Sequence, residues 1–298
     1  MAEPYSVIDV HPEMRGELEQ LGSKPKFWFK YEGHNWLFKE ARENTGEDWS
    51  EKVASEIATL MGLSTHHTEL ASWQGKRGCA VKSFLVPKQE VLIHGNELLG
   101  GLLKHYDTEK VRGQSDHTFE NIVKVIETLF IEGKPRRNAA LAMVGYLVFD
   151  ALVGNTDRHH QNWGVVLKPQ TSKEDGSHFL IRIAPTFDHA SSLGRELRDE
   201  ARRRYLETGA IPRYIRKARG GIFETAESPK GLSPMQLASL LAERYSDLFK
   251  PWQKRVAAID KSDLVNILSH VPIELMSPDA QAFALALIEQ NQQHLLKL

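Results

Sequence analysis

The chain has 298 residues, 41% of them hydrophobic, so it can form two lobes or one large domain with a real core. Its 38 basic and 39 acidic residues nearly cancel, so no whole-molecule field indicates a nucleic-acid or membrane binder. The single cysteine, Cys79, excludes an internal disulfide and a cysteine-based zinc site, and no apolar signal-like segment is visible at the N-terminus. Together these features favour a cytoplasmic protein.

Two aromatic-rich strands are the first predicted elements. Residues 27–31 (FWFKY) and 36–39 (WLFK) flank a short polar turn, a pattern typical of a β-hairpin. A second β stretch, over 68–73 and 79–85, is divided by the turn 75–78. These strands predict a small β-rich lobe within residues 1–90.

One helix is predicted inside this lobe, from Asp48 to Gly62. Its apolar face is expected to consist of Val53, Ile57, Leu60 and Met61, and Gly62 is the stop signal.

Residues 91–298 predict a mainly helical lobe. Helical period and length occur over residues 119–130, 139–153, 234–245 and 278–296. The segment 139–153 is the most apolar, but its 15 residues include Asp150 and fall short of the roughly 20 needed to span a bilayer. It therefore predicts a helix buried on all sides, with no membrane contact. A β interruption over 163–167 and 179–184, joined by the polar turn 169–177, predicts a second hairpin.

The densest polar cluster, residues 154–163, lies between the apolar helix and this second hairpin. Four residues separate Asp157 from Asn162, as in the catalytic loop of protein kinases. Asp188 follows the last strand of the hairpin, where its carboxylate can fold back toward the loop. Magnesium takes carboxylates together with substrate phosphates, so Asn162 and Asp188 predict a metal site and Asp157 a base. Taken singly, Asp157 and Asn162 could equally serve a turn or the loop backbone.

Two stretches, residues 155–163 (NTDRHHQNW) and 187–194 (FDHASSLG), resemble the signature stretches of HipA-like serine/threonine kinases. The resemblance implies an α+β, bilobal protein-kinase-like fold, with a small strand-rich N-lobe, a helical C-lobe, and ATP and Mg²⁺ between them. It implies that Asp157 is the catalytic base and that Arg158 and His159 shape the catalytic loop. It also implies that Asn162 and Asp188 hold the magnesium ion.

The resemblance further implies nucleotide-binding residues in the first lobe. Lys39 matches the lysine that pairs with ATP phosphates. Its expected partner is Glu56, which borders the apolar face of the helix, in preference to Glu51. Residues 81–84 (VKSF) stand at the interlobe hinge, so the backbone around Lys82 is expected to meet adenine while Phe84 borders the ring. The open alternatives are an ordinary strand-end lysine for Lys39, a solvated helix charge for Glu56 and a buried edge strand for residues 81–84.

The phosphate loop departs from common patterns, because neither Gly-x-Gly-x-x-Gly nor a Walker sequence occurs. The nearest candidate is residues 21–26 (LGSKPK). There Gly22 permits close backbone approach, and Lys24 or Lys26 adds charge. This segment resembles the short phosphate loop of the family, in which a serine can be autophosphorylated to switch the enzyme off, so Ser23 is the expected phosphosite. The alternative is a basic surface turn.

Partners are predicted only in outline. The resemblance implies a protein substrate with a Ser or Thr acceptor, ranked above a lipid or small molecule. Many family members carry an additional N-terminal subdomain, so this chain is expected to be a short form. Several members are toxins of toxin–antitoxin operons, which implies a small antitoxin or a separate N-terminal-subdomain protein as partner. The locally basic segment 195–220 is a solvated helix face or a recognition surface for an acidic protein, a phosphorylated residue or an RNA-bound substrate.

Two other function classes stay open. A transition metal held by His159, His160 and His189 with Asp157 and Asp188 would indicate a metal-dependent phosphohydrolase, which leaves Lys39 and Glu56 without a role. A pseudokinase or nucleic-acid-binding regulatory module acting through the basic segment leaves the carboxylates unexplained. His66 and His67 have no ligand partner at suitable spacing and are expected on a loop surface.

Overall fold

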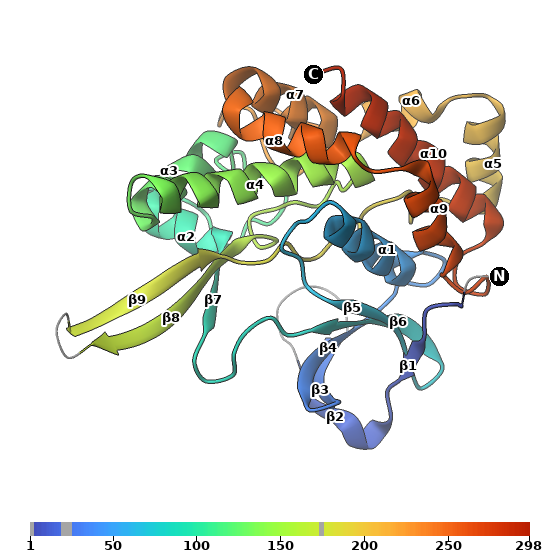
Figure 1. Cartoon of the computed structure of the whole chain (residues 1–298), viewed down its shortest axis with the longest axis horizontal. Helices are drawn as coiled ribbons and strands as arrows, with labels where there is room; N and C mark the ends of the chain where they lie inside the picture. The colour runs from blue at the N-terminus through green and yellow to red at the C-terminus, as the bar shows by residue number, and fades with distance from the viewer. Residues whose placement is uncertain (1–2, 19–25, 173–175) are drawn as a thin grey trace.

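The computed structural model describes residues 3–18, 26–172 and 176–298. A strand-rich part and a mainly helical part are joined side by side, and helix α1 (Glu47–Leu60) lies between them (Figure 1). This arrangement confirms the predicted α+β, two-lobed kinase-like fold. Within the described ranges, no helix combines the length and apolar character needed to cross a membrane.

The strand-rich part is a six-stranded sheet in the order β1-β5-β6-β4-β3-β2. Its strands are β1 (Val7–Asp9), β2 (Arg15–Leu18), β3 (Lys26–Tyr31), β4 (His34–Glu40), β5 (Thr68–Trp73) and β6 (Lys76–Lys82). A short 3₁₀ turn, η1 (Pro12–Met14), precedes β2.

The first predicted hairpin is confirmed as the antiparallel pair β3 and β4. Its turn residues Glu32 and Gly33 both have positive φ, as a two-residue hairpin turn requires. Aromatic side chains at alternate positions bury one face of the pair: Phe27, Phe29, Trp36 and Phe38. In the second pair, β5 and β6, the turn falls at Gln74 and Gly75, so β6 begins earlier than predicted.

Helix α1 confirms the predicted helix, but its burial differs from the prediction. Val53, Ile57 and Met61 are buried, whereas Leu60 is 41% exposed. Residues 47–55 are buried all round, although most of them are polar or charged. The first turns of α1 are therefore packed on every side, between the sheet and the helical part.

The helical part is built around α4 (Lys134–Val153), on which α7, α8 and α10 pack. The other helices are α2 (Gly95–Leu102), α3 (Phe119–Leu129), α5 (Asp199–Glu207), α6 (Ile211–Lys217), α7 (Pro234–Arg244), α8 (Ser246–Ala257), α9 (Lys261–Ser269) and α10 (Pro278–Leu295). The four predicted helices correspond to α3, α4, α7 and α10. Helix α4 ends at Gly154, whose left-handed conformation (φ 71°) turns the chain into the polar loop 154–163.

The second predicted hairpin is also confirmed, and it is longer than expected. Strands β8 (Gly164–Ser172) and β9 (Gly176–Ile183) pair with each other, and β7 (Val91–His94) pairs with β8. Pro169 lies within the ladder, not in the turn. The hairpin extends away from the helices (Figure 1). Because Val165 pairs with Ile183, the loop before β8 and the segment after β9 leave the hairpin at the same end.

Candidate active site

Three charged side chains from separate elements meet where the two parts of the molecule join. Lys39 lies on β4, Glu51 on α1, and Asp188 five residues after the end of β9. The Lys39 Nζ donates a hydrogen bond to Asp188 Oδ1 at 3.0 Å and lies 3.9 Å from Glu51 Oε2. The Asp188 side chain is 36% exposed, whereas Glu51 is fully buried. The carboxylate of Glu51 therefore contacts only protein, whereas solvent can reach the carboxylate of Asp188.

The predicted partnership of Lys39 with Glu56 is wrong. Glu56 accepts from Lys52 Nζ at 2.7 Å, one helical turn away, and Glu51 is the α1 carboxylate beside Lys39. The prediction assumed a helix with a single buried face, and on such a helix Glu51 points to solvent. Because the first turns of α1 are packed all round, Glu51 is buried as well.

Opposite charges fix the ionisation of this cluster. Burial alone would lower the pKa of Lys39, but the carboxylates of Asp188 and Glu51 outweigh it and raise that pKa. Burial would raise the pKa of Asp188, yet Lys39, with a further contribution from Lys26, lowers that pKa to about 2. The lysine is therefore charged and Asp188 ionised at neutral pH.

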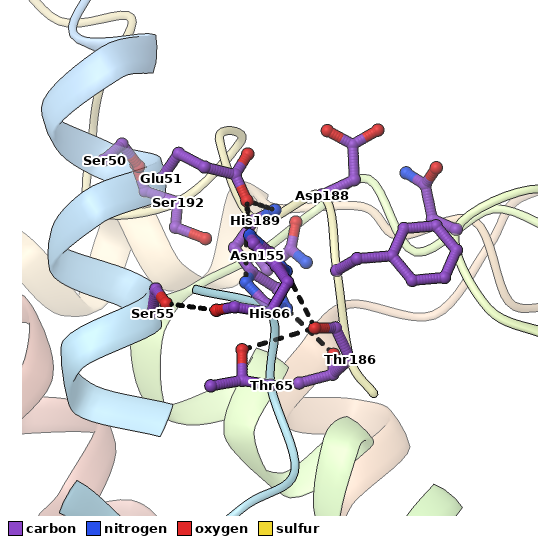
Figure 2. Close-up of polar contacts among 12 residues, drawn as sticks. Ser50, Glu51, Ser55, Thr65, His66, Asn155, Thr186, Asp188, His189 and Ser192 are labelled. Atoms are coloured by element: carbon purple, nitrogen blue, oxygen red, sulfur yellow. Dashed lines mark hydrogen bonds and ion pairs between the residues drawn. The ribbon is translucent and has the colours of Figure 1, made fainter. Parts of the chain in front are cut away.

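Two histidines contact the other carboxylate oxygen of Glu51, Oε1 (Figure 2). His66 Nε2 lies 2.9 Å from Glu51 Oε1, and the backbone N–H of His189 donates to the same oxygen at 2.9 Å. His66 Nδ1 donates to the Thr186 carbonyl at 2.9 Å. Burial would raise the pKa of Glu51, but Lys39 and His66 hold it well below its usual range. The expectation of a surface position for His66 is wrong, since the residue is 1% exposed.

The Thr186 hydroxyl links this cluster to the loop 154–163. It accepts from Arg158 Nη2 at 3.0 Å, so its proton is available to His189 Nε2 at 2.8 Å. The other ring nitrogen of His189, Nδ1, lies 3.7 Å from Glu51 Oε1. Burial holds the pKa of His189 well below its usual value, so the ring is neutral.

A buried ion pair forms the base of the loop 154–163. Arg158 binds Asp150 of α4 through two hydrogen bonds of 2.7 Å, and both side chains are 4% exposed. The same guanidinium donates to the backbone carbonyls of Asn162, at 2.5 Å, and Phe187, at 3.2 Å. Arg158 therefore joins α4, the loop and the segment that carries Asp188.

Asp157, next to Arg158 in the loop 154–163, faces solvent. It is exposed, and its Oδ2 lies 3.5 Å from Ser191 Oγ. The Asn162 amide group donates to the Asp157 carbonyl at 2.7 Å, which leaves the Asn162 Oδ1 as the atom suited to a cation. Asp188 adopts φ 62°, a conformation that non-glycine residues seldom occupy and that recurs at functional sites.

The expected hinge residues lie at the edge of this site. Phe84 stacks on Phe187, with ring centroids 6.0 Å apart. The amides of Lys82 and Ser83 donate to the carbonyls of His67 and Asn35, so these two amides are already used within the protein. An adenine ring would therefore have to use other groups of this segment. The Lys82 Nζ lies over the ring of Trp36.

Part of the predicted phosphate loop lies outside the described residues, including Gly22, Ser23 and Lys24. Its last residue, Lys26, begins β3 directly opposite Lys39 of β4. This register accounts for its influence on the Asp188 carboxylate.

The histidines are not arranged as the phosphohydrolase alternative requires. Within the described ranges, the one His and carboxylate group close enough to share an ion is Glu51 with His66 and His189. The two imidazoles stack at 5.1 Å with planes 17° apart, so an ion in the plane of one ring lies outside the plane of the other. His160 hydrogen-bonds Tyr106 Oη at 2.7 Å, and burial lowers its pKa to about 4.

Similar proteins share both the sequence pattern and the fold. The HipA-like C-terminal domain family matches residues 20–243. A serine/threonine-protein kinase, CtkA of Helicobacter pylori, is 33% identical over 147 residues, which are 49% of this chain and 40% of that protein. The chain thus matches less than half the length of this relative in sequence.

Solved structures extend the likeness to the whole fold. The H. pylori proinflammatory kinase CtkA superposes with a TM-score of 0.76 at 20% identity, covering 98% of this chain and 96% of that one. HipA of Shewanella oneidensis MR-1, solved with HipB and operator DNA, gives a TM-score of 0.54 at 14% identity, covering 97% of this chain and 65% of that one.

The fold is the one that these solved kinase structures have. The lysine, the buried helix carboxylate and the aspartate after the hairpin follow one another in the order found in protein kinases. The chain belongs to the HipA-like C-terminal domain family, whose pattern covers most of its length.

Proposed function

We propose that this chain is an ATP- and magnesium-dependent serine/threonine protein kinase. The observation that carries the proposal is the contact of Lys39 with both Asp188 and the buried Glu51, together with an exposed Asp157 in the neighbouring loop. This set supplies a cation for phosphate, a carboxylate for a metal and a second carboxylate for a hydroxyl. The rival phosphohydrolase has no use for Lys39 or Glu51.

The residues present fit a magnesium ion. Asp188 is ionised and partly exposed, and the Asn162 amide oxygen is the free end of its side chain. Both are hard oxygen ligands, and Mg²⁺ is usually held by one or two carboxylates plus substrate phosphates. When bound, the ion would neutralise negative charge on the transferred phosphoryl group.

The protein's own groups then take separate roles. Lys39, held between Asp188 and Glu51, is positioned to bind a phosphate oxygen. Asp157 is accessible and accepts the proton of the acceptor hydroxyl. The buried pair of Arg158 and Asp150 anchors the loop to α4, and this anchoring holds the Asp157 carboxylate in place.

The acceptor and the partner belong to the same proposal. A protein Ser or Thr is the acceptor that the name of the curated relative supports. The HipA structure comes from a toxin–antitoxin system with HipB, so a small antitoxin-type partner in the cytoplasm is the corresponding proposal for this chain.

Replacing Asp157 tests the proposal. We expect the parent protein to transfer the γ-phosphate of radiolabelled ATP to itself or to a casein-type acceptor in Mg²⁺, and to stop in EDTA. Asp157→Ala should lower the rate about 10³-fold, within the range of general base catalysis. Asp247→Ala, an exposed aspartate on α8, is the matched control and should keep full activity. Transfer that persists unchanged in Asp157→Ala would falsify the assignment of the base.

A further inference from the structure

Two cavities are lined by residues of α5 and α6. These two helices lie at the end of the helical part, beside α10 (Figure 1). The volumes of the cavities are about 490 and 520 Å³, within the range of ligand sites. They share Leu197, Tyr205 and Lys217 in their linings, so the two cavities adjoin each other. We refer to the pair as the basic groove.

The basic groove starts at the candidate active site. Its first cavity is lined by Thr156 and Ser191. Thr156 precedes Asp157, and the Ser191 hydroxyl lies 3.5 Å from the Asp157 carboxylate. A bound molecule whose hydroxyl group reaches Asp157 can therefore extend into the groove.

The lining of the groove is strongly cationic. The charged residues of the two cavities are Arg195, Arg204, Arg213, Lys217, Arg219 and Glu196. Arg195 is paired with Glu47, and Glu196 accepts from the Tyr214 hydroxyl at 2.8 Å. Arg204, Arg213 and Lys217 are exposed and form no ion pair with any carboxylate in the described part of the chain. These three charges are available to an anionic partner.

The floor of the groove is apolar and contains one unsatisfied acceptor. Ile215 and Leu287 are buried in it. Asn291 is 1% exposed and donates its Nδ2 to the Leu152 carbonyl at 3.0 Å. Its Oδ1 has no hydrogen-bond donor among the described residues. An acceptor of this kind can be met by an ordered water or by an N–H group of a ligand.

We propose that the basic groove binds an acidic segment of the protein substrate, with an apolar side chain on the floor, next to the acceptor Ser or Thr. The inference rests on the proposed kinase function and specifies its substrate class. A peptide offers carboxylates to the cations and amide N–H groups to Asn291. A single-stranded nucleic acid usually stacks its bases on aromatic side chains, but here Tyr205 and Tyr214 are packed against each other (5.7 Å) and against Phe283 (6.0 and 5.3 Å).

Charge reversal in the groove tests this proposal. Three fluorescein-labelled serine peptides with one leucine are compared, with glutamate, glutamine or lysine beside the serine. The parent should bind and phosphorylate the glutamate peptide at least tenfold better than the lysine peptide, and less so at high salt. Arg204→Glu with Arg213→Glu should raise KM and Kd for the glutamate peptide about tenfold, with kcat within twofold. Lys250→Glu with Lys254→Glu on α8, outside the groove, makes the same charge change and should alter neither.

The outcomes separate the groove from the kinase assignment. If no peptide is phosphorylated and the protein does not modify itself, the kinase proposal fails, while the anisotropy titrations still decide the groove. Equal binding of all three peptides, or no effect of the double reversal, overturns the groove. A labelled single-stranded RNA that binds the parent and loses affinity in the double reversal, while the glutamate peptide does not, overturns the peptide in favour of RNA.

Discussion

The charged groups around Glu51 and those of the basic groove are organised in opposite ways. Glu51 has no exposed surface and meets Lys39, His66 and the His189 amide. Arg204, Arg213 and Lys217 face solvent and have no ionic partner within the described ranges. Preorganised charges favour chemistry because they need no rearrangement during the reaction, whereas accessible charges select a ligand.

The largest effect is expected at the buried pair of Arg158 and Asp150 next to the loop 154–163. Arg158→Met leaves Asp150 buried without its cation, and breaking a buried pair in this way costs about 3–5 kcal/mol of unfolding free energy. Arg244→Met removes an arginine that is 46% exposed and pairs with Glu120 and Glu224, so it should cost less than about 1 kcal/mol. Urea denaturation followed by circular dichroism measures both. Equal losses in the two variants would show that burial of the pair is unimportant.

The next effect distinguishes the two glutamates of α1. Glu51→Gln removes the buried charge that orients Lys39, and a misplaced catalytic group lowers the rate about 10²-fold. Glu56→Gln removes a carboxylate that meets Lys52, so kcat should stay within twofold. Steady-state phosphorylation rates at saturating ATP give both values. A large loss in Glu56→Gln with none in Glu51→Gln would reinstate the pairing expected from the helix periodicity.

The smallest effect is a dependence of stability on pH at His117. This ring donates Nδ1–H to the Gly221 carbonyl and accepts from Trp163 Nε1, and burial is the main cause that lowers its pKa to about 3. Because the folded-state pKa is depressed, the unfolded state binds more protons below pH ~6.5, and stability falls as pH falls from there toward 3.

Substituting His117 isolates this contribution. Between pH 7 and pH 5, the parent should lose about 2 kcal/mol more unfolding free energy than His117→Gln, which has no titrating ring. Urea titrations at the two pH values measure the difference. If both proteins lose the same amount, His117 does not titrate as its surroundings imply.

The local features of the fold could be predicted from the sequence. The alternation of aromatic residues predicted the hairpin that carries Lys39. The position of a polar loop directly after an apolar helix indicated Asp157 and Asn162 as candidate site residues. These signals lie within short segments. The order of the loop, the hairpin and Asp188 was sufficient to predict that the loop and Asp188 meet.

The surroundings of Glu51 could not be predicted in the same way. Its partners Lys39, His66 and His189 come from three separate segments, so neither helical periodicity nor ligand spacing reveals them. Burial of polar residues over 47–55 contradicts a one-faced helix and follows only from packing between the two parts of the molecule. The same limit applies to Asp150, which a sequence shows only as a charge in an apolar helix.

A crystal structure of the protein with Mg²⁺ and a non-hydrolysable ATP analogue tests the central claim most directly. We predict that the terminal phosphate lies beside the Lys39 ammonium, that the ion contacts Asp188 and Asn162, and that Asp157 faces the open side of that phosphate. Phosphates bound away from Lys39, or an ion that contacts neither Asp188 nor Asn162, would contradict the account.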